Sequence, residues 1–275
     1  MSFYKALAFS LFSFFCILFV ACSRRPPEGM VAVPAGEFIM GTDEVDETHF
    51  AEEQGIVKPW LVDEGPAHKI HLPLYYIDRT EVTNRQYAEF LQATNRPAPE
   101  HWENGTYPKG SDLYPAVMVP WQQAQEYCIW RGGRLPTEAE WEKAARGTDG
   151  RRYPWGNEFD PKKANIGGTA KDLSPTGKFP EGKSPYGVLD MVGNAWEWTA
   201  DWYRPYSGSR YQSKEYGKQV KVIRGNSWST IGHFPPDVQK EMVKHHSTAT
   251  FRLYARPDST ISDVGFRCVR PGEPA

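Results

Sequence analysis

The sequence predicts a compact domain that contains both helices and strands but only a modest amount of regular structure. The chain has 275 residues, and its 24 glycines and 23 prolines predict many turns. Its 10 tryptophans, 14 tyrosines and 14 phenylalanines supply large side chains that hold such a turn-rich core together. The length allows one large domain or two small ones. The net charge of −2 gives no reason to expect nucleic acid or an anionic surface as a partner.

The first 21 residues have the features of a secretory signal peptide. Lys5 supplies a short basic region, and residues 6–21 form the apolar run that follows it. We expect this segment to direct export, so that the mature domain lies outside the cytoplasm.

Cys22 follows small residues in a pattern that resembles a bacterial lipobox, with Phe19 at the position where leucine is usual. The resemblance implies cleavage before Cys22 and lipidation of its thiol; a simple membrane anchor is the alternative. Ser23, rather than aspartate, comes next, which favours the outer membrane under the usual sorting rule. We therefore expect a lipidated tether over residues 22–29 and one domain over residues 30–275, facing the periplasm or the cell surface.

The domain opens with strand and loop signals. Residues 30–41 predict two short strands around a Pro-Ala-Gly turn. Residues 42–65 form a long acidic loop, for which a solvated insertion is the favoured interpretation. Residues 68–77 alternate between apolar and polar side chains, which predicts a strand.

Helix signals follow. Residues 83–86 and 137–140 each form a capping box, in which a threonine and a Gln or Glu three positions later satisfy each other's backbone amides. Apolar side chains then recur at helical spacing, and glycines mark helix ends. Helices are therefore expected over residues 84–94, 121–131 and 138–146.

The rest of the chain combines loops with short strands. Residues 149–186 contain repeated Pro, Gly and Asn turns and no periodic pattern. A structureless segment of this length is unusual inside a compact domain unless something, such as bound ions, orders it. Strands are predicted over residues 220–224, 250–255 and 264–269.

The most distinctive stretch is residues 189–202, which combines tryptophans with carboxylates and an asparagine. Strand alternation places Glu197 on one face and Trp196 and Trp198 on the other. Such a segment suits a core strand that also binds a metal ion through oxygen ligands. A core strand whose polar groups are simply hydrogen-bonded is an equally good interpretation.

The cysteines divide into two groups. Cys16 leaves with the signal and Cys22 would carry the lipid, so Cys128 and Cys268 remain. In an oxidising compartment these two most simply form a disulfide. Such a bridge is worth roughly 4–5 kcal/mol in the chain-entropy model. A reactive thiol pair is the alternative, although neither cysteine has a CxxC neighbour or an adjacent histidine.

Several segments, in order along the chain, resemble motifs of one family, the formylglycine-generating enzymes or sulfatase-modifying factors. They are residues 30–41 (MVAVPAGEFIMG), 76–84 (YIDRTEVTN), 134–142 (RLPTEAEWE), 153–156 (YPWG), 189–202, 224–228 (RGNSW) and 265–268 (GFRC). The resemblance covers about residues 30–271. It implies a single irregular α+β domain, a variant of the C-type lectin fold with little regular secondary structure and bound calcium.

The resemblance also implies roles for individual residues. Cys128 and Cys268 match a structural disulfide. The implied ligands of a first structural calcium ion are Asp190, Gly193, Ala195 and Glu197. Asn165 and Ile166 match the start of a second calcium loop, the rest of which is shorter in this sequence, and Asp172 could complete that ligand set. Asp190 replaces the usual asparagine but still supplies an oxygen, the type of ligand that calcium prefers.

Residue 230 carries the main departure from the family. The enzyme proper has two cysteines just after the Gly-Ser-Trp block, which bind copper and oxidise a substrate cysteine with oxygen. Here Thr230 stands where the first should be, and no cysteine occurs between Cys128 and Cys268. A hydroxyl cannot replace the soft thiolate that Cu(I) selects. We therefore predict that the protein does not make formylglycine, and we expect neither copper nor iron at this position.

An oxidoreductase of altered chemistry is one class of function that stays open. Some relatives without the cysteine pair still oxidise, such as those of pyoverdine maturation. Iron-dependent relatives, such as those of ergothioneine synthesis, take their ligands largely from a partner domain that we do not find in this sequence. The candidate pocket residues are Trp228, Ser229, Thr230 and His233. A metal site built from His233, His245 and His246 is possible in principle, but three unrelated surface histidines are favoured.

A non-catalytic, calcium-stabilised binding module of C-type-lectin type is the alternative. Such scaffolds present variable loops on a rigid frame, and function follows the loops rather than the fold. Residues 229–262 would then form the recognition surface. The expected partners are the membrane, through a lipid at Cys22, and a protein or small-molecule ligand, with no nucleic acid.

Overall fold

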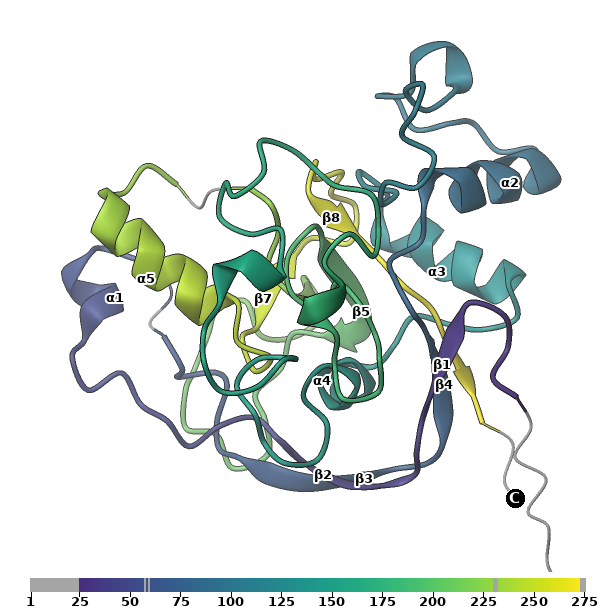
Figure 1. Ribbon diagram of the computed structural model, residues 1–275. Helices are drawn as coiled ribbons and strands as arrows, with labels where there is room; N and C mark the ends of the chain where they lie inside the picture. The colour runs from purple at the N-terminus through teal and green to yellow at the C-terminus, as the bar shows by residue number, and fades with distance from the viewer. Residues whose placement is uncertain (1–24, 57, 59, 230–231, 273–275) are drawn as a thin grey trace, which may run out of the picture.

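Three small sheets and a few helices make up the fold in the computed structural model (Figure 1), which describes residues 25–56, 58, 60–229 and 232–272. The helices are α1 (Phe50–Glu53), α2 (Asn84–Thr94), α3 (Trp121–Trp130), α4 (Glu138–Arg146) and α5 (Pro236–His246). The strands are β1 (Met30–Val33), β2 (Gly36–Met40), β3 (His68–Leu72), β4 (Tyr75–Asp78), β5 (Trp196–Trp202), β6 (Lys221–Arg224), β7 (Leu253–Ala255), β8 (Val264–Gly265) and β9 (Val269–Pro271). Short 3₁₀ turns cover Glu103–Gly105, Pro161–Lys163 and Pro180–Gly182. The predicted class is confirmed: an α+β domain with little regular structure.

The strands are distributed over separate sheets. Their orders are β1-β4-β9, β2-β3 and β7-β6-β5-β8. Neighbouring strands run antiparallel, except that β5 and β8 run parallel. The four-stranded sheet contains the tryptophan-rich stretch and carries it into the core, where Trp198 is fully buried.

Two predicted strands are each split between two sheets. The prediction of one strand over residues 68–77 is wrong, because β3 ends at Leu72 and β4 begins at Tyr75 in a different sheet. Pro73 lies between them and has no N–H to donate, which ends the first pairing. Residues 264–269 likewise divide between β8 and β9. β1 and β2 exist as predicted but also belong to different sheets.

The predicted helices and their capping boxes are confirmed. The Thr83 hydroxyl accepts from the Gln86 amide at 3.3 Å, and the Gln86 side chain accepts from the Thr83 amide at 3.0 Å. The Thr137 hydroxyl and the Glu140 side chain do the same at 3.2 and 2.8 Å. α2, α3 and α4 match the expected ranges within one residue. α5 was not predicted.

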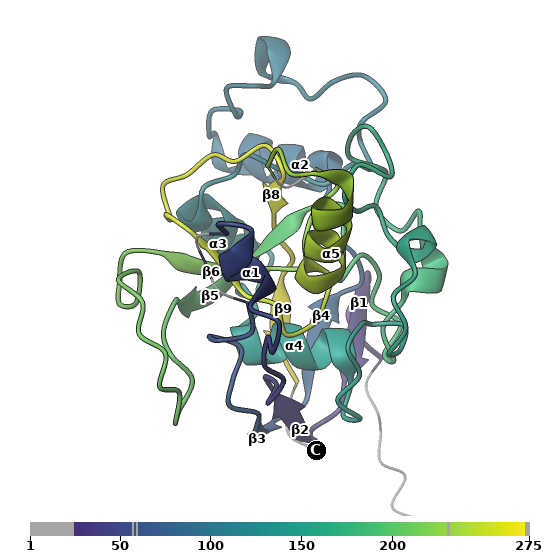
Figure 2. The ribbon, with the colours of Figure 1, turned by 90° about the vertical axis from the view of Figure 1, so that its left-hand side faces the viewer.

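α4 lies at the centre of the domain, between the four-stranded sheet and the β2–β3 pair (Figures 1 and 2). The apolar face predicted for this helix, Trp141, Ala144 and Ala145, is fully buried. Its charged residues are buried as well: Glu138, Glu140, Glu142, Lys143 and Arg146. Because a buried charge is costly unless it is paired, this helix needs partners from elsewhere in the chain.

The predicted signal peptide and Cys22 lie outside the described residues. In the part of the chain that the structure covers, no helix is both long and apolar enough to span a bilayer. Export and lipidation therefore stay predictions from the sequence.

Candidate functional site

A chain of buried ion pairs ties α4 to β6 and to the start of β7. Arg224 donates to Glu138 at 2.8 Å and to Glu142 at 2.7 Å. Arg252 extends the chain through Glu138 at 2.7 Å, and Arg146 extends it through Glu142 at 3.0 Å. Removal of one member would leave an uncompensated buried charge. Two of the motif segments, residues 134–142 and 224–228, supply Glu138, Glu142 and Arg224 of this chain of ion pairs. These motifs therefore hold the frame of the domain together.

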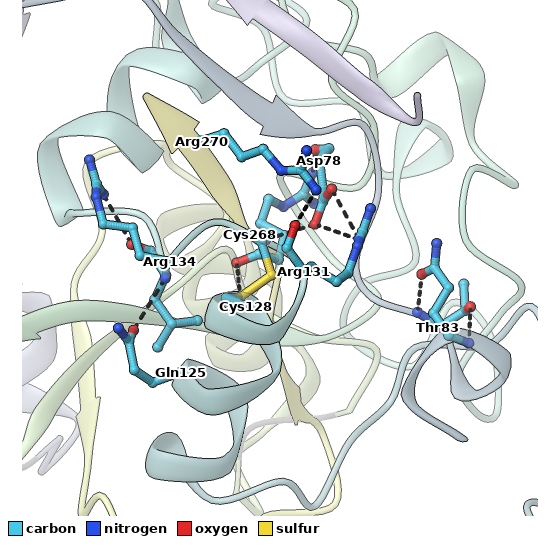
Figure 3. The surroundings of a disulfide bond; sticks show 11 residues. Asp78, Thr83, Gln125, Cys128, Arg131, Arg134, Cys268 and Arg270 are labelled. Carbon is cyan, nitrogen blue, oxygen red and sulfur yellow. Dashed lines mark hydrogen bonds and ion pairs between the residues drawn. A yellow bond between two sulfur atoms is a disulfide. The ribbon is translucent and has the colours of Figure 1, made fainter. Parts of the chain in front are cut away.

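The disulfide predicted from the cysteine count is confirmed. Cys128 of α3 is bonded to Cys268, and their Cα atoms are 5.5 Å apart (Figure 3). Asp78 lies beside the bridge, where it accepts from the Cys268 amide at 2.8 Å and faces Arg131 at 3.4 Å. Burial raises the pKa of Asp78, and the charge of Arg131 opposes that rise. Both sulfur atoms are thus bonded to each other, so neither is a free thiol in this structure.

The predicted pocket beyond Trp228 is brought together only in part. Ser229 donates to Asp263 at 2.7 Å, and the serine before Trp228 donates to the same oxygen at 2.6 Å. The Trp228 indole N–H is buried and has no acceptor among the described residues. His233 is exposed, and Thr230 lies outside the described residues. The two serine hydroxyls are committed to a carboxylate, which is not the histidine partner that activates a nucleophilic serine.

Glu197 is engaged by an arginine. Its two oxygens accept from Arg267 at 2.6 Å each, and one of them also accepts from the Trp141 indole at 2.9 Å. All three side chains are fully buried. These hydrogen bonds satisfy the Glu197 carboxylate within the core strand, and its predicted role as a calcium ligand stays a prediction.

Two other buried carboxyl groups lie beside this arginine. Asp190 accepts from the Gly177 amide at 2.5 Å, and Glu81 accepts from the Asn194 side chain at 2.9 Å. The second oxygen of Glu81 is buried without a donor among the described residues. Burial raises the pKa of both groups, and the charge of Asp190 adds to the rise at Glu81. The sequence singled out Asp190 but not Glu81, although Glu81 lies within the motif at residues 76–84.

Gly193 holds the two predicted calcium segments against each other. Its φ is 87°, and a Cβ at this position would lie 2.5 Å from the carbonyl oxygen of Asn165. The Asn194 amide donates to that same oxygen at 2.8 Å. Ala195 follows, fully buried, directly before β5. The two segments are therefore adjacent in the fold.

The second predicted calcium loop is assembled in part. The Asn165 side chain donates to the Asp172 carbonyl at 3.1 Å, but its own oxygen is buried without a donor among the described residues. The Ile166 carbonyl accepts from Thr169 at 2.8 Å, and the Asp172 side chain is exposed. In the described part of the chain, no group of three or more His, Cys, Asp or Glu residues could hold a metal ion. The predicted calcium is thus not shown.

Comparison with known proteins decides the family. A family model described as the sulfatase-modifying factor enzyme 1-like domain matches residues 18–271. The chain belongs to this family. It is 33% identical over 293 residues to the inactive C-alpha-formylglycine-generating enzyme 2 of Mus musculus, covering 87% of this chain and 84% of the relative. It is 32% identical over 316 residues to the formylglycine-generating enzyme of Thermomonospora curvata, covering 89% of this chain and 95% of the relative.

Solved structures share the sulfatase-modifying-factor fold of this chain. PvdO from Pseudomonas aeruginosa superposes with a TM-score of 0.65 and 28% identity, over 88% of this chain and 94% of PvdO. Treponema denticola variable protein 1 superposes with a TM-score of 0.63 over 88% of this chain and 95% of its own. Its identity is 21%, so this second likeness supports the fold alone.

A cluster that the sequence did not reveal lies between the acidic loop and α5 of this family member. The interpretation of residues 42–65 as a solvated insertion is wrong at the end of the loop, where Asp63 and Glu64 are fully buried. Lys58 pairs with Asp63 at 2.9 Å, and the Tyr203 hydroxyl donates to the same carboxylate at 2.6 Å. These partners allow the acids to be buried as charges.

His245 and His246 of α5 are buried, so their interpretation as surface histidines is wrong. Nε2 of His245 lies 3.2 Å from the Glu64 carboxylate, and the ring stacks on Trp60 with centroids 4.5 Å apart. Burial alone would raise the pKa of Glu64, but the charges of His245 and Lys58 outweigh it and hold the pKa at about 2. Burial lowers the pKa of His246 well below its usual value. The one feature of the sequence that points to this packing is Trp60, an indole within an otherwise acidic loop.

Much of the predicted recognition surface is therefore interior. Within residues 229–262, Phe251 belongs to the hydrophobic core and Arg252 to the chain of ion pairs. Its solvent-facing parts are the outward side of α5 with the loops around it and the loop after β7, where Arg256 and Asp258 are exposed. A ligand would meet this segment there rather than along its whole length.

Proposed function

We propose that this sulfatase-modifying-factor family member is exported, held at a membrane through Cys22, and binds a ligand without making formylglycine. One observation carries the proposal. Between residue 30 and the end of the sequence the only cysteines are Cys128 and Cys268, and they are bonded to each other. The domain thus offers no thiolate, the ligand that Cu(I) requires.

The residues around Trp228 support this proposal. The Ser229 hydroxyl is hydrogen-bonded to Asp263, which makes it an oxygen group in a polar cluster. Oxygen ligands suit hard cations such as calcium rather than Cu(I). The oxygen groups beside Trp228 therefore do not replace the soft thiolate ligands that the family's cysteine pair would supply.

Structural calcium is part of the same proposal, and two observations support it. When Glu81, Asp190 and Glu197 are all ionised, they place three negative charges in the interior against the single positive charge of Arg267. A divalent cation would balance that charge. The unpaired oxygens of Glu81 and Asn165 are available to it, whereas the Glu197 carboxylate is held by Arg267. Bound calcium would supply only structural order, and a melting temperature that falls on chelation would test it.

A peptide assay tests the catalytic part. The protein is incubated with a cysteine-containing sulfatase peptide, copper and a reductant, beside the Thermomonospora curvata formylglycine-generating enzyme as the positive control. Mass spectrometry should show formylglycine with the control and an unchanged cysteine with this chain. Conversion of the peptide by this chain would contradict the proposal.

An oxidoreductase of altered chemistry is the second candidate. The observation that favours it is the likeness to PvdO over 94% of that chain at 28% identity. Metal analysis and oxygen uptake with thiol and phenol substrates separate the two candidates. Stoichiometric copper or iron with oxygen uptake would favour the oxidoreductase, whereas calcium alone without uptake would favour the binding module.

A further inference from the structure

Two hollows flank Trp60: the first lies within the acidic loop, which carries α1, and the second lies between that loop and the helix α5. α1 and α5 lie next to each other in Figures 1 and 2. Their volumes are about 430 and 300 Å³. The residues that line both are Glu44, Val45, Asp46, Trp60 and Leu61. The two hollows together are termed the Trp60 site. Trp228, Ser229 and His233 line neither of them.

The first hollow is acidic around an apolar floor. Its carboxylates are those of Asp43, Glu44, Asp46 and Glu52. No lysine or arginine of the described chain lines it, and His49 lies 3.9 Å from Glu52. Val45 and Val62 supply aliphatic surface that is exposed to solvent. This combination favours a ligand with a positive charge and an apolar part.

The second hollow has the same sign of charge. The charged residues that line it are Glu44, Asp46, Glu47, Glu241, Arg152 and Lys244, together with His245, whose charge is paired with the buried Glu64. Arg152 pairs with Glu44 at 2.7 Å, and Lys244 pairs with Glu241 at 3.5 Å, so these charges cancel. Asp46 and Glu47 are left over, and the surplus is again negative.

Unpaired polar atoms gather behind Trp60. Both oxygens of Glu64, Nε2 of His245, Nδ1 of His246 and the Trp60 indole nitrogen are buried without a hydrogen-bond partner among the described residues. Glu64 is 0% and His245 8% exposed, and their 3.2 Å contact is not aligned as a hydrogen bond. Trp60 lines both hollows and His245 lines the second, whereas Glu64 and His246 line neither. Buried polar groups are nearly always hydrogen-bonded, so the unpaired nitrogens of Trp60 and His245 beside the hollows indicate a polar ligand.

We infer that the Trp60 site binds an organic cation, an amine or guanidinium group carried on an apolar stem. The surplus acids attract the charge, while Trp60 and its aliphatic neighbours bury the stem. The inference rests on the proposed binding function and gives that function a class of ligand.

Isothermal titration calorimetry on the disulfide-bonded full chain tests the inference with three probes. Hexylamine carries both the charge and the stem, hexan-1-ol carries only the stem, and methylammonium carries only the charge. Saturable binding of hexylamine, with the other two probes about tenfold weaker or more, would support the site. Failure of hexylamine to bind, or equal binding of hexan-1-ol, would overturn it.

Charge variants locate the binding. Asp46→Asn combined with Glu52→Gln removes two carboxylate charges at nearly constant size and should weaken hexylamine binding about tenfold. Glu100→Gln combined with Glu181→Gln, two exposed acids outside the site, is the matched control and should leave binding unchanged. Equal weakening by both pairs would mean a general charge effect and would also overturn the site. None of these outcomes alters the peptide assay for formylglycine, so the two failures are distinguishable.

Discussion

Removal of the Cys128–Cys268 bridge tests the stability argument most directly. The bond spans a sequence separation of 140 residues. For a loop of that length the chain-entropy model gives about 5 kcal/mol of stabilisation at 25 °C. The double variant Cys128→Ala, Cys268→Ala should therefore lower the free energy of unfolding by about that amount, which is a large part of the stability of an ordinary domain.

Urea unfolding followed by tryptophan fluorescence measures this loss. The midpoint should fall, and the dependence on urea should become steeper, because an unfolded chain without the cross-link exposes more surface. Reduced wild-type protein keeps both sulfur atoms and loses only the bond, so it is the matched control and should unfold like the double variant. Two titratable thiols in the folded, exported protein, or a loss below about 1 kcal/mol, would refute the reasoning.

The remaining predictions concern buried carboxyl groups. Glu142→Gln should lower the free energy of unfolding by about 3–5 kcal/mol, because Arg224 loses a buried partner, whereas Glu89→Gln on the exposed side of α2 should change it by less than ~0.5 kcal/mol. Glu81→Gln should raise the melting temperature at neutral pH in the presence of a chelator, because burial and the charge of Asp190 raise the pKa of Glu81 and disfavour its ionised form. A carboxyl group with a raised pKa stabilises the fold below its ordinary pKa of 4.5 and loses that contribution as the pH rises. The gain in melting temperature from Glu81→Gln should therefore vanish in acid. A gain that persists in acid would contradict a raised pKa as its cause. Glu64→Gln should have the opposite pH dependence: with its pKa held at about 2, Glu64 stabilises the fold above pH 4.5, and the melting temperatures of wild type and variant should converge as the pH falls from 4.5 towards 2.

The helices could be predicted because their signals are local. In each capping box both partners lie within one turn, so the residue types alone determine the hydrogen bonds. Strand pairing is different, because it depends on partners far away in the sequence. The alternation of residues 68–77 is real, yet it does not show that Pro73 divides the segment between two sheets.

Prediction of the candidate site from the sequence is limited in the same way, because contacts between distant residues are not visible in it. The disulfide followed from counting, because the predicted loss of Cys16 with the signal and the predicted lipidation of Cys22 leave Cys128 and Cys268 to pair with each other. Glu64 could not be recognised as buried, because an acidic composition favours solvent unless a partner compensates for burial. Its partner, His245, comes from a helix near the other end of the chain, and apart from Trp60 in the acidic loop the sequence carries no sign of that contact.

The buried chain of ion pairs makes family membership and activity separable. Selection for a folded domain is enough to preserve the arginines and glutamates that interlock around α4, whether or not any reaction is left to perform. A family defined by motifs that contain these arginines and glutamates will include both catalysts and non-catalysts, and its members include enzymes and relatives described as inactive. The short run after Trp228, where this sequence departs from the family's cysteine pair, contributes no residue to those ion pairs, so it can change while the frame around it persists.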